Sequence, residues 1–429
     1  MTRRFLLLIF FLYALLFLGL ASRTGAVIAL AIPFAVYLGA ALIFIPNKPE
    51  LSARRTLSTQ HVTQGVTVTV RVEITNLGEK VEELLVQDVL PAEVELVQGH
   101  TRAAATLSPG KTVDLEYEVK AKRGRYTFNY VQATATDYLE LFEKRVTLKA
   151  AADLLILPSV QKLHSIPIRP LRTHGFSGPI PSRKVGAGVN FLSIRGYQAG
   201  DPLRWINWRL SARHPDEVFS NEFELERIAD IGIILDARQQ SDIEAQDGNL
   251  FEYSVQATAS LADTFLGDGN RVGLLIYGRG MESTFPGYGK IQRQRILQSL
   301  GRARPGNSYA FKSLENLPTR FFPSGSQIVL VSPLDREDIP ILIQLRALGY
   351  ELMVVSPDPI SFEARHYKEE KTAGLAIRAA NLERAMMIHG LRRVGIPVVN
   401  WQVESSLDNA LHRTVSLMVK KHQLLMVSK

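Results

Sequence analysis

The distribution of apolar and polar residues divides the chain into segments of different character. Residues Phe5 to Ala21 are apolar throughout, and after a short polar turn a second apolar run extends from Ala26 to Ile45. Each run is close to the ~20 residues that a helix needs to cross a bilayer, so the pattern predicts a transmembrane helical hairpin over residues 1–47. A cleaved signal peptide is the alternative for the first run, because Arg3 and Arg4 precede it. The second run follows too closely to favour that alternative.

Basic residues are concentrated at the outer ends of the two apolar runs. They are Arg3, Arg4, Lys48, Arg54 and Arg55. Only Arg23 lies in the turn between the runs. Since basic loops stay on the cytoplasmic side, we expect a cell-membrane protein with two helices and cytoplasmic soluble domains.

Short runs of alternating residues occupy the chain from residue 56 to residue 157. Apolar and polar residues alternate with period two from Val66 to Ile74 and again from Thr112 to Val119. Turn formers such as Pro91 separate these runs. Several short strands separated by turns predict an antiparallel β-sandwich of immunoglobulin-like type. Its acids are scattered, so we expect a spacer or an interaction module.

Residues 158–227 connect the two predicted domains, and the first part of this connector, residues 158–188, is rich in proline, glycine and basic residues. We expect an irregular arm there, because proline at this density excludes regular helix. The connector contains His164 and His174, which lack the i,i+4 spacing of a helical metal site. We therefore do not expect these two histidines to bind a metal ion.

Apolar strands alternate with amphipathic helices from residue 228 to residue 429. Among them we expect a helix over Asn249–Gly267, a strand over Gln327–Val331 and a final helix with Leu407, Leu411 and Met418 on one face. This alternation predicts an α/β domain with a doubly wound, mainly parallel sheet and helices on both faces. Such a sheet binds ligands at the carboxyl ends of its strands. Asp236, Ser332 and Asp335 follow predicted strands and are therefore candidate site residues.

Composition adds few constraints to this picture. Apolar residues make up 46% of the 429 residues, which is enough for ordinary cores, and the net charge of +8 is a mild bias. Cysteine is absent, which excludes disulfides, thiolate zinc sites and cysteine nucleophiles. Four arginines lie close together at Arg293, Arg295, Arg302 and Arg304. An exposed helical face explains them, and we expect no specific nucleic-acid partner.

The segment from Arg195 to Arg213 combines arginines, an acid and large rings. Its charged and aromatic members are Arg195, Tyr197, Asp201, Arg204, Trp205, Trp208, Arg209 and Arg213. Arginine can bind a carboxylate through two hydrogen bonds and can stack on an aromatic ring, so the composition of the segment is consistent with a surface that docks a partner. A buried ion-pair belt between two domains fits equally well, and on the residues alone we favour the belt. The belt predicts that Arg204→Ala or Arg213→Ala destabilises the soluble part.

This segment resembles the signature of the family called domain of unknown function 58. The matching residues are Arg195, Tyr197, Gly200, Asp201, Arg204, Ile206, Trp208, Ser211, Ala212 and Arg213, followed by Glu222, Phe223 and Glu226. The resemblance implies a prokaryotic membrane protein with a transmembrane hairpin, a small β-domain and a C-terminal von Willebrand factor A-like domain. It also implies a link to MoxR-type AAA+ ATPases, which are thought to act in assembly or maturation of other proteins.

A factor A domain that binds metal carries the motif D-x-S-x-S after its first strand. Here the run begins at Asp236, and Arg238 and Gln240 stand where the two serines belong. A fixed cation beside a divalent ion is unfavourable, so we expect no metal and no cofactor at this position. We expect Asp236 and Asp335 to pair with Arg238 instead.

The combined features predict a membrane-anchored adaptor that binds other proteins, working with a MoxR-type ATPase, and not an enzyme. A membrane-associated hydrolase is the alternative from a different class. It needs a nucleophile beside a base, and serines such as Ser332 lack the context of a nucleophile elbow.

Overall fold

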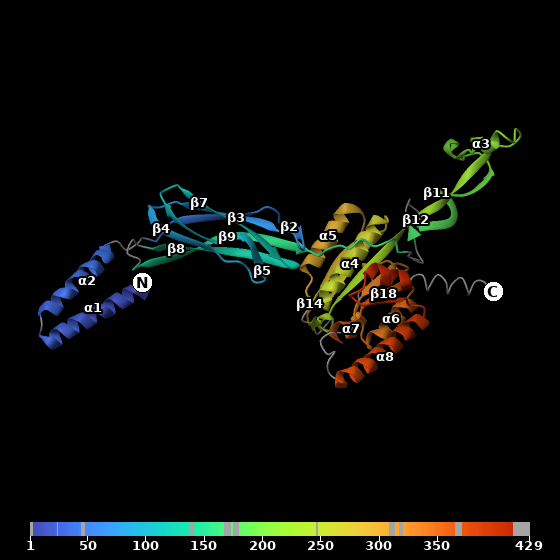
Figure 1. The fold of residues 1–429 in the computed structure, drawn as a ribbon. Coiled ribbons are helices and arrows are strands. Elements are labelled where there is room, and N and C mark those ends of the chain that lie inside the picture. Colours follow the sequence, from blue (N-terminus) through green and yellow to red (C-terminus); the bar gives the residue numbers. More distant parts are fainter. Residues whose placement is uncertain are drawn as a thin grey trace. The chain divides into compact units, whose positions relative to one another are not determined.

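Two compact units make up the chain, Met1–Leu157 and Pro158–Lys429. The structure is a computed structural model (Figure 1). It describes residues 3–23, 25–43, 48–136, 141–166, 173–174, 180–245, 248–308, 314–316, 321–364 and 371–414.

Two apolar helices begin the first unit, α1 (Arg3–Ser22) and α2 (Gly25–Ile43). They pack closely at Gly19, where a Cβ atom would lie 2.6 Å from Cγ1 of Ile28. Helix α1 is long and apolar enough to cross a membrane, whereas the apolar stretch Gly25–Ala41 in α2 is shorter. Signal sequences share these properties of α1. An N-terminal membrane anchor is thus supported, while two crossings and a cytoplasmic orientation stay predictions.

The rest of the first unit is rich in strands that form two sheets. One sheet has the order β1 (Leu51–Leu57), β3 (Val68–Asn76), β7 (Thr112–Ala121), β5 (Val94–Gly99). The other has the order β2 (His61–Thr63), β9 (Glu143–Leu157), β8 (Gly124–Thr136), β4 (Val81–Asp88), β6 (Arg102–Leu107). Strand neighbours are antiparallel except β2 and β9. Inward residues of both sheets, such as Val70 and Phe128, share one core.

A buried ion pair joins the two sheets of this unit. Arg55 on β1 donates to the carboxylate of Asp88 on β4 and to the backbone carbonyl of Ala150 on β9. The hydroxyl of Tyr117 on β7 donates to Asp88 Oδ2 at 2.6 Å. Burial, followed by the neighbouring Asp88, raises the pKa of Tyr117, so the phenol stays a donor. Sequence reasoning missed this network, because it assigned Arg55 to the basic flank of the hairpin.

A mixed sheet forms the centre of the second unit. Its order is β16 (Met281–Gly287), β15 (Arg271–Gly278), β12 (Phe219–Ala237), β17 (Gln327–Val331), β18 (Glu351–Pro357), β19 (Val398–Trp401). All neighbouring pairs are parallel except the edge pair β15 and β16. The named helices are α4 (Leu250–Gly267), α5 (Gly289–Arg302), α6 (Asp338–Ala347), α7 (Pro359–Ala364) and α8 (Lys371–Arg393). Residues 407–414 are also helical, and Met418, expected on that helix, lies outside the described residues.

Helices lie against both faces of this sheet. On one face, Ile234 and Leu330 share a core with Leu342 of α6 and Leu391 of α8. Residues that alternate with these, such as Val329, are also buried, and α4 contacts β12, β15, β17 and β18. Because successive strand residues point to opposite faces, strands buried on both sides read as continuous apolar runs.

Strand β12 continues far beyond the sheet. Its second half pairs with β15 and β17, and its first half pairs with the antiparallel strand β11 (Ile180–Gly196). The short strand β10 (Thr173–His174) pairs with it between these halves. A boundary between residues 227 and 228 would therefore cut a continuous strand. Residues 180–188, expected within an irregular arm, instead belong to strand β11, which has register shifts, whereas residues 158–166 of that arm lie outside helices and strands. We call residues 180–227 the lobe.

Short elements complete the second unit. They are η1 (Leu203–Trp205), α3 (Trp208–Ser211), η2 (Gln239–Ser241), β13 (Glu244–Ala245), β14 (Gly248–Asn249) and η4 (Leu314–Asn316).

Candidate functional site

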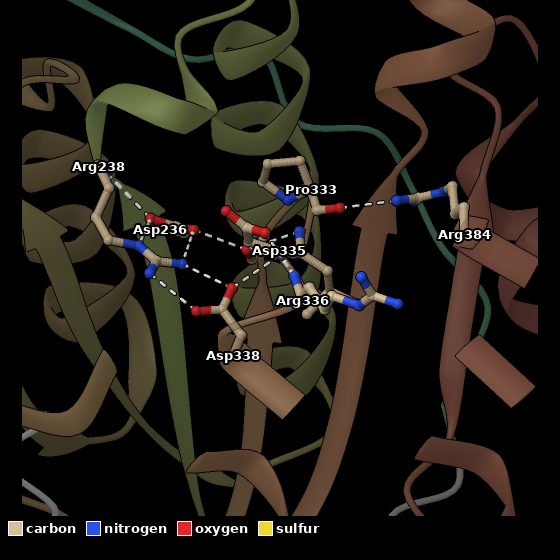
Figure 2. Close-up of polar contacts among 9 residues, drawn as sticks. Asp236, Arg238, Pro333, Asp335, Arg336, Asp338 and Arg384 are labelled. Carbon is tan, nitrogen blue, oxygen red and sulfur yellow. Dashed lines mark hydrogen bonds and ion pairs between the residues drawn. The ribbon is translucent and has the colours of Figure 1, made fainter. Parts of the chain in front are cut away.

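The carboxyl end of β12 carries the first part of the candidate site. Asp236 is the penultimate residue of the strand, and Arg238 follows it directly (Figure 2). The guanidinium of Arg238 turns back on Asp236: Nε donates to Oδ1 at 2.9 Å and Nη2 donates to Oδ2 at 2.8 Å. Both side chains are buried. Two parallel hydrogen bonds fix the arginine against this carboxylate.

A second carboxylate closes on the same guanidinium from the start of α6. Arg238 Nη1 donates to Oδ1 of Asp338 at 2.9 Å, and Nη2 donates to Oδ2 at 2.9 Å. The backbone N–H of Asp335 donates to Asp338 Oδ2 at 3.0 Å. The prediction that Asp335 pairs with Arg238 is thus wrong, because the turn exposes the Asp335 side chain and directs Asp338 inward.

Ser332 and Gln240 extend the cluster. The hydroxyl of Ser332, at the end of β17, donates to Asp236 Oδ2 at 2.7 Å and accepts from the backbone N–H of Leu334 at 3.0 Å. With its amide oxygen turned to the guanidinium, Gln240 accepts from Arg238 Nη2 at 3.0 Å. The buried Ser332 hydroxyl therefore links the Asp236 carboxylate to the backbone that follows β17.

Electrostatics favour a permanently charged arginine in this cluster. Burial opposes the charge of Arg238, but hydrogen bonds to Asp236 and Asp338 outweigh burial and raise its pKa. Burial raises the pKa of Asp338, and Arg238 offsets part of that effect. The guanidinium satisfies both carboxylates, so the residues at this edge do not fit a divalent metal ion. The positive charge is supplied by the chain itself.

A second buried arginine ties neighbouring strands together at the same edge. Arg384 of α8 donates from Nη1 to the carbonyl of Pro333 at 2.8 Å, from Nη2 to Ser356 Oγ at 2.9 Å and to Asn400 Oδ1 at 2.9 Å. Its Nε lies 3.2 Å from Asp358 Oδ1. Burial lowers its pKa, although it stays a cation because arginine titrates far above neutrality.

In the lobe, one arginine of the signature segment is structural. Arg195 makes a bidentate ion pair with Asp201, in which Nη1 donates to Oδ2 and Nη2 donates to Oδ1, both at 2.8 Å. Its Nε donates to Glu222 Oε1 at 2.8 Å. Hydrogen bonds to Asp201 raise the pKa of Arg195, and the same contact lowers the pKa of Asp201. Gly200, at φ 111°, makes the turn that brings Asp201 back. These contacts lie within the lobe and form no belt between domains.

Asn207 and Ser211 fix the short helix of the lobe. The Asn207 side chain accepts from the backbone N–H of Leu210 at 3.0 Å, capping α3. Ser211 Oγ donates to the Asn207 carbonyl and accepts from the backbone N–H of Phe219, both at 2.9 Å. Trp205 packs beside Phe223 with ring centroids 5.8 Å apart. The backbone of α3 is therefore fastened to β12.

Several other side chains of the segment face solvent, whereas Ile206 is buried. Leu203 is 70% exposed, Trp208 is 67% exposed, and Tyr197 is also exposed. Three exposed arginines form no ion pair with another described residue, namely Arg204, Arg209 and Arg213. Glu226 lies on β12, where its backbone pairs with Pro181. The expectation that Arg204 or Arg213 stabilises a buried belt is therefore wrong.

Comparisons with known proteins find a family similar to part of the second unit, from within the lobe to strand β18. Residues 193–355 match the family described as "Protein of unknown function DUF58". The uncharacterized protein YeaD of Bacillus subtilis (strain 168) is 28% identical over 255 residues, and the match spans 58% of this chain and 61% of YeaD.

Similarity to solved structures is much weaker. The CARDB domain of a Pyrococcus furiosus protein is 19% identical, with a TM-score of 0.19, covering 27% of this chain and 99% of that one. A FixG-related protein from Vibrio parahaemolyticus is 16% identical, with a TM-score of 0.17, covering 26% and 98%. These scores support no conclusion about function.

Proposed function

We propose that the chain is a membrane-anchored adaptor that binds an acidic surface of a protein partner through its lobe. The exposed side chains of Leu203, Trp208 and the three arginines Arg204, Arg209 and Arg213 on an internally fixed lobe carry this proposal. No acidic residue occurs between Leu203 and Arg213. Exposed tryptophan and arginine are the side chains most often dominant in protein interfaces.

We further propose that the second unit contains a von Willebrand factor A-like domain without the usual metal. Numbered from β12, the sheet order is 3-2-1-4-5-6 with strand 3 antiparallel, which supports a doubly wound fold. The guanidinium of Arg238 binds the carboxylates of Asp236 and Asp338. On this proposal the guanidinium occupies the position that a divalent cation takes in a metal-binding relative.

The resemblance to the DUF58 family suggests the partner, a MoxR-type AAA+ ATPase. On this proposal the two N-terminal helices form a hairpin in the cell membrane and the remainder is cytoplasmic. Exposed arginines increase the association rate with an acidic surface, and an exposed tryptophan supplies binding energy once it is buried.

Binding of the purified full-length protein in detergent to a purified MoxR-type ATPase from the same organism tests the proposal. We expect Trp208→Ala to weaken the affinity by about 30-fold, the loss of a typical hot-spot side chain. Charge reversal of Arg209 and Arg213 to glutamate should slow association, while the matched reversal of exposed Arg295 and Arg378 should not.

The possible failures are distinguishable. If wild-type protein does not bind the ATPase, the partner is wrong. If it binds and Trp208→Ala binds equally well, the lobe is not the docking surface.

A further inference from the structure

A second polar cluster joins the segment that enters the second unit to the last described helix. His164 Nδ1 lies 2.7 Å from Asp408 Oδ2, and the backbone N–H of His164 donates to Asp408 Oδ1 at 2.8 Å. His412 Nε2 lies 3.9 Å from Asp408 Oδ1. The two imidazole rings have centroids 5.0 Å apart. Two imidazoles and a carboxylate thus meet from positions far apart in the sequence.

Buried neighbours anchor the backbone that carries these three side chains. Leu163 and Ile166 flank His164 and are buried, while the imidazole of His164 is 75% exposed. Leu407 and Leu411 are buried on the helix that carries Asp408 and His412. The backbone is therefore anchored on both sides, and the side-chain ends stay open to solvent.

We propose that His164, Asp408 and His412 bind one Zn²⁺ ion. One ligand atom from each residue lies within 4.8 Å of the others. Zinc bonds of about 2.05 Å in a tetrahedral arrangement place ligand atoms about 3.3 Å apart. The two contacts are made to different oxygens of Asp408, because His164 Nδ1 lies 2.7 Å from Oδ2 and His412 Nε2 lies 3.9 Å from Oδ1. A tetrahedral ion takes one of these oxygens, so the carboxylate must turn until a single oxygen lies about 3.3 Å from both ring nitrogens. The two exposed imidazoles can follow by small rotations of their side chains.

The chemistry of the ligand set selects the metal. Imidazole nitrogen with one carboxylate suits zinc, which then keeps water at its fourth position, whereas magnesium and calcium prefer more oxygen ligands. Burial works against ionisation of Asp408, but hydrogen bonds from His164 outweigh burial and lower its pKa. Asp408 is therefore ionised at neutral pH. Zinc must displace the hydrogen shared by His164 and Asp408, so binding competes with protons.

A bound ion would cross-link two segments that are far apart in the sequence. It would connect residue 164, at the entrance to the second unit, with the helix over residues 407–414. Zinc would then stabilise the segment that precedes the lobe, independently of any partner bound to the lobe.

Calorimetric titration of the chelator-treated full-length protein with ZnCl₂ at about pH 7.5, above the ordinary histidine pKa, tests this site. We expect about one saturable equivalent per chain, and with Co²⁺ the visible absorption of a four-coordinate site. His412→Gln should weaken binding by more than about tenfold, the loss seen even for outer-shell partners. His389→Gln, an exposed histidine on α8, is the matched control and should bind as wild type.

His412→Gln decides the proposal, because its folded structure loses only a 3.9 Å contact and a ring contact. Melting in chelator should be the same as for wild type. Absence of a saturable equivalent in the wild type, or equal affinity in His412→Gln, would overturn the proposed site.

Discussion

Arg238→Met tests whether the guanidinium holds the carboxyl edge of the sheet together. Methionine keeps much of the side-chain volume and removes the charge and every donor. Asp236 and Asp338 would then face each other, buried and without the four hydrogen bonds of 2.8–2.9 Å that satisfy them.

The expected loss is large. Removing one partner from a buried ion pair costs about 3–5 kcal/mol, because the remaining charge stays uncompensated. At about 2–4 °C per kcal/mol for a domain of this size, the melting temperature should fall by about 6–20 °C. Neutralising both acids in Asp236→Asn/Arg238→Met/Asp338→Asn should recover most of this loss, since no unpaired charge remains.

Tryptophan fluorescence reports this transition. All three tryptophans, Trp205, Trp208 and Trp401, lie in the second unit, and Trp401 is buried at the end of β19. Unfolding of the full-length protein in detergent can therefore be followed for that unit alone. Arg295→Met, at an exposed arginine of α5, is the control and should melt within about 0.5 kcal/mol of wild type.

The pH dependence supplies an independent check. In Arg238→Met, burial and like charge raise the folded-state pKa of the carboxylates above their unfolded value of about 3.9. The folded variant then binds more protons than the unfolded chain, so its deficit is largest at neutral pH and shrinks as the pH falls toward that value. A loss below about 1 kcal/mol at neutral pH, or a deficit that grows in acid, would refute the reasoning.

Three further predictions concern other parts of the molecule. Asp88→Asn should destabilise the first unit by about 3–5 kcal/mol by leaving Arg55 unpaired, whereas the exposed Asp114→Asn should cost at most about 1 kcal/mol; circular dichroism of the β-signal measures both. Gly278→Ala should cost about 1–3 kcal/mol or more in fluorescence-monitored melting, because the new Cβ would lie 2.0 Å from the carbonyl oxygen of Ala237, while Gly280→Ala meets no atom within 4 Å. Arg195→Gln should speed amide exchange in the lobe, and Arg209→Gln should not. Arg195 lowers the pKa of Asp201, so the wild-type lobe should keep its protection from amide exchange at pH values above the ordinary carboxyl pKa. That protection should be lost as the pH falls through the lowered pKa of Asp201, and protection that increases in acid would contradict this.

Long periodic segments were predictable from the sequence, but the strands β16 and β11 at the margins of the sheet were not. The apolar run Gln327–Val331 is the strand β17, and the helix expected from Asn249 begins one residue later with Asn249 as its cap. The edge strand β16 was missed, because its exposed side chains give no clear alternation. Strand β11 was missed because it contains prolines and glycines, and pairing with β12 outweighs its weak intrinsic tendency.

The candidate site was predictable only in part. Asp236 and Arg238 were paired correctly because they lie two residues apart. Asp338 was missed because three acids follow β17, and the turn at Leu334, with φ 62°, decides which of them points inward. Arg384 had a readable signal, since it shares a helical face with the apolar residues Ile388 and Leu391.

The 19-residue strand β12 has a mechanical consequence. Its buried residues alternate between two apolar layers, so sliding by one position would bring the wrong side chains into each layer. Burial on both faces therefore resists displacement of the strand along its axis when a load is applied to the lobe. We expect the load to reach the carboxyl end of β12 as a bend or a twist near residues 228–230. There the strands paired with β12 change from β10 and β11 to β15 and β17.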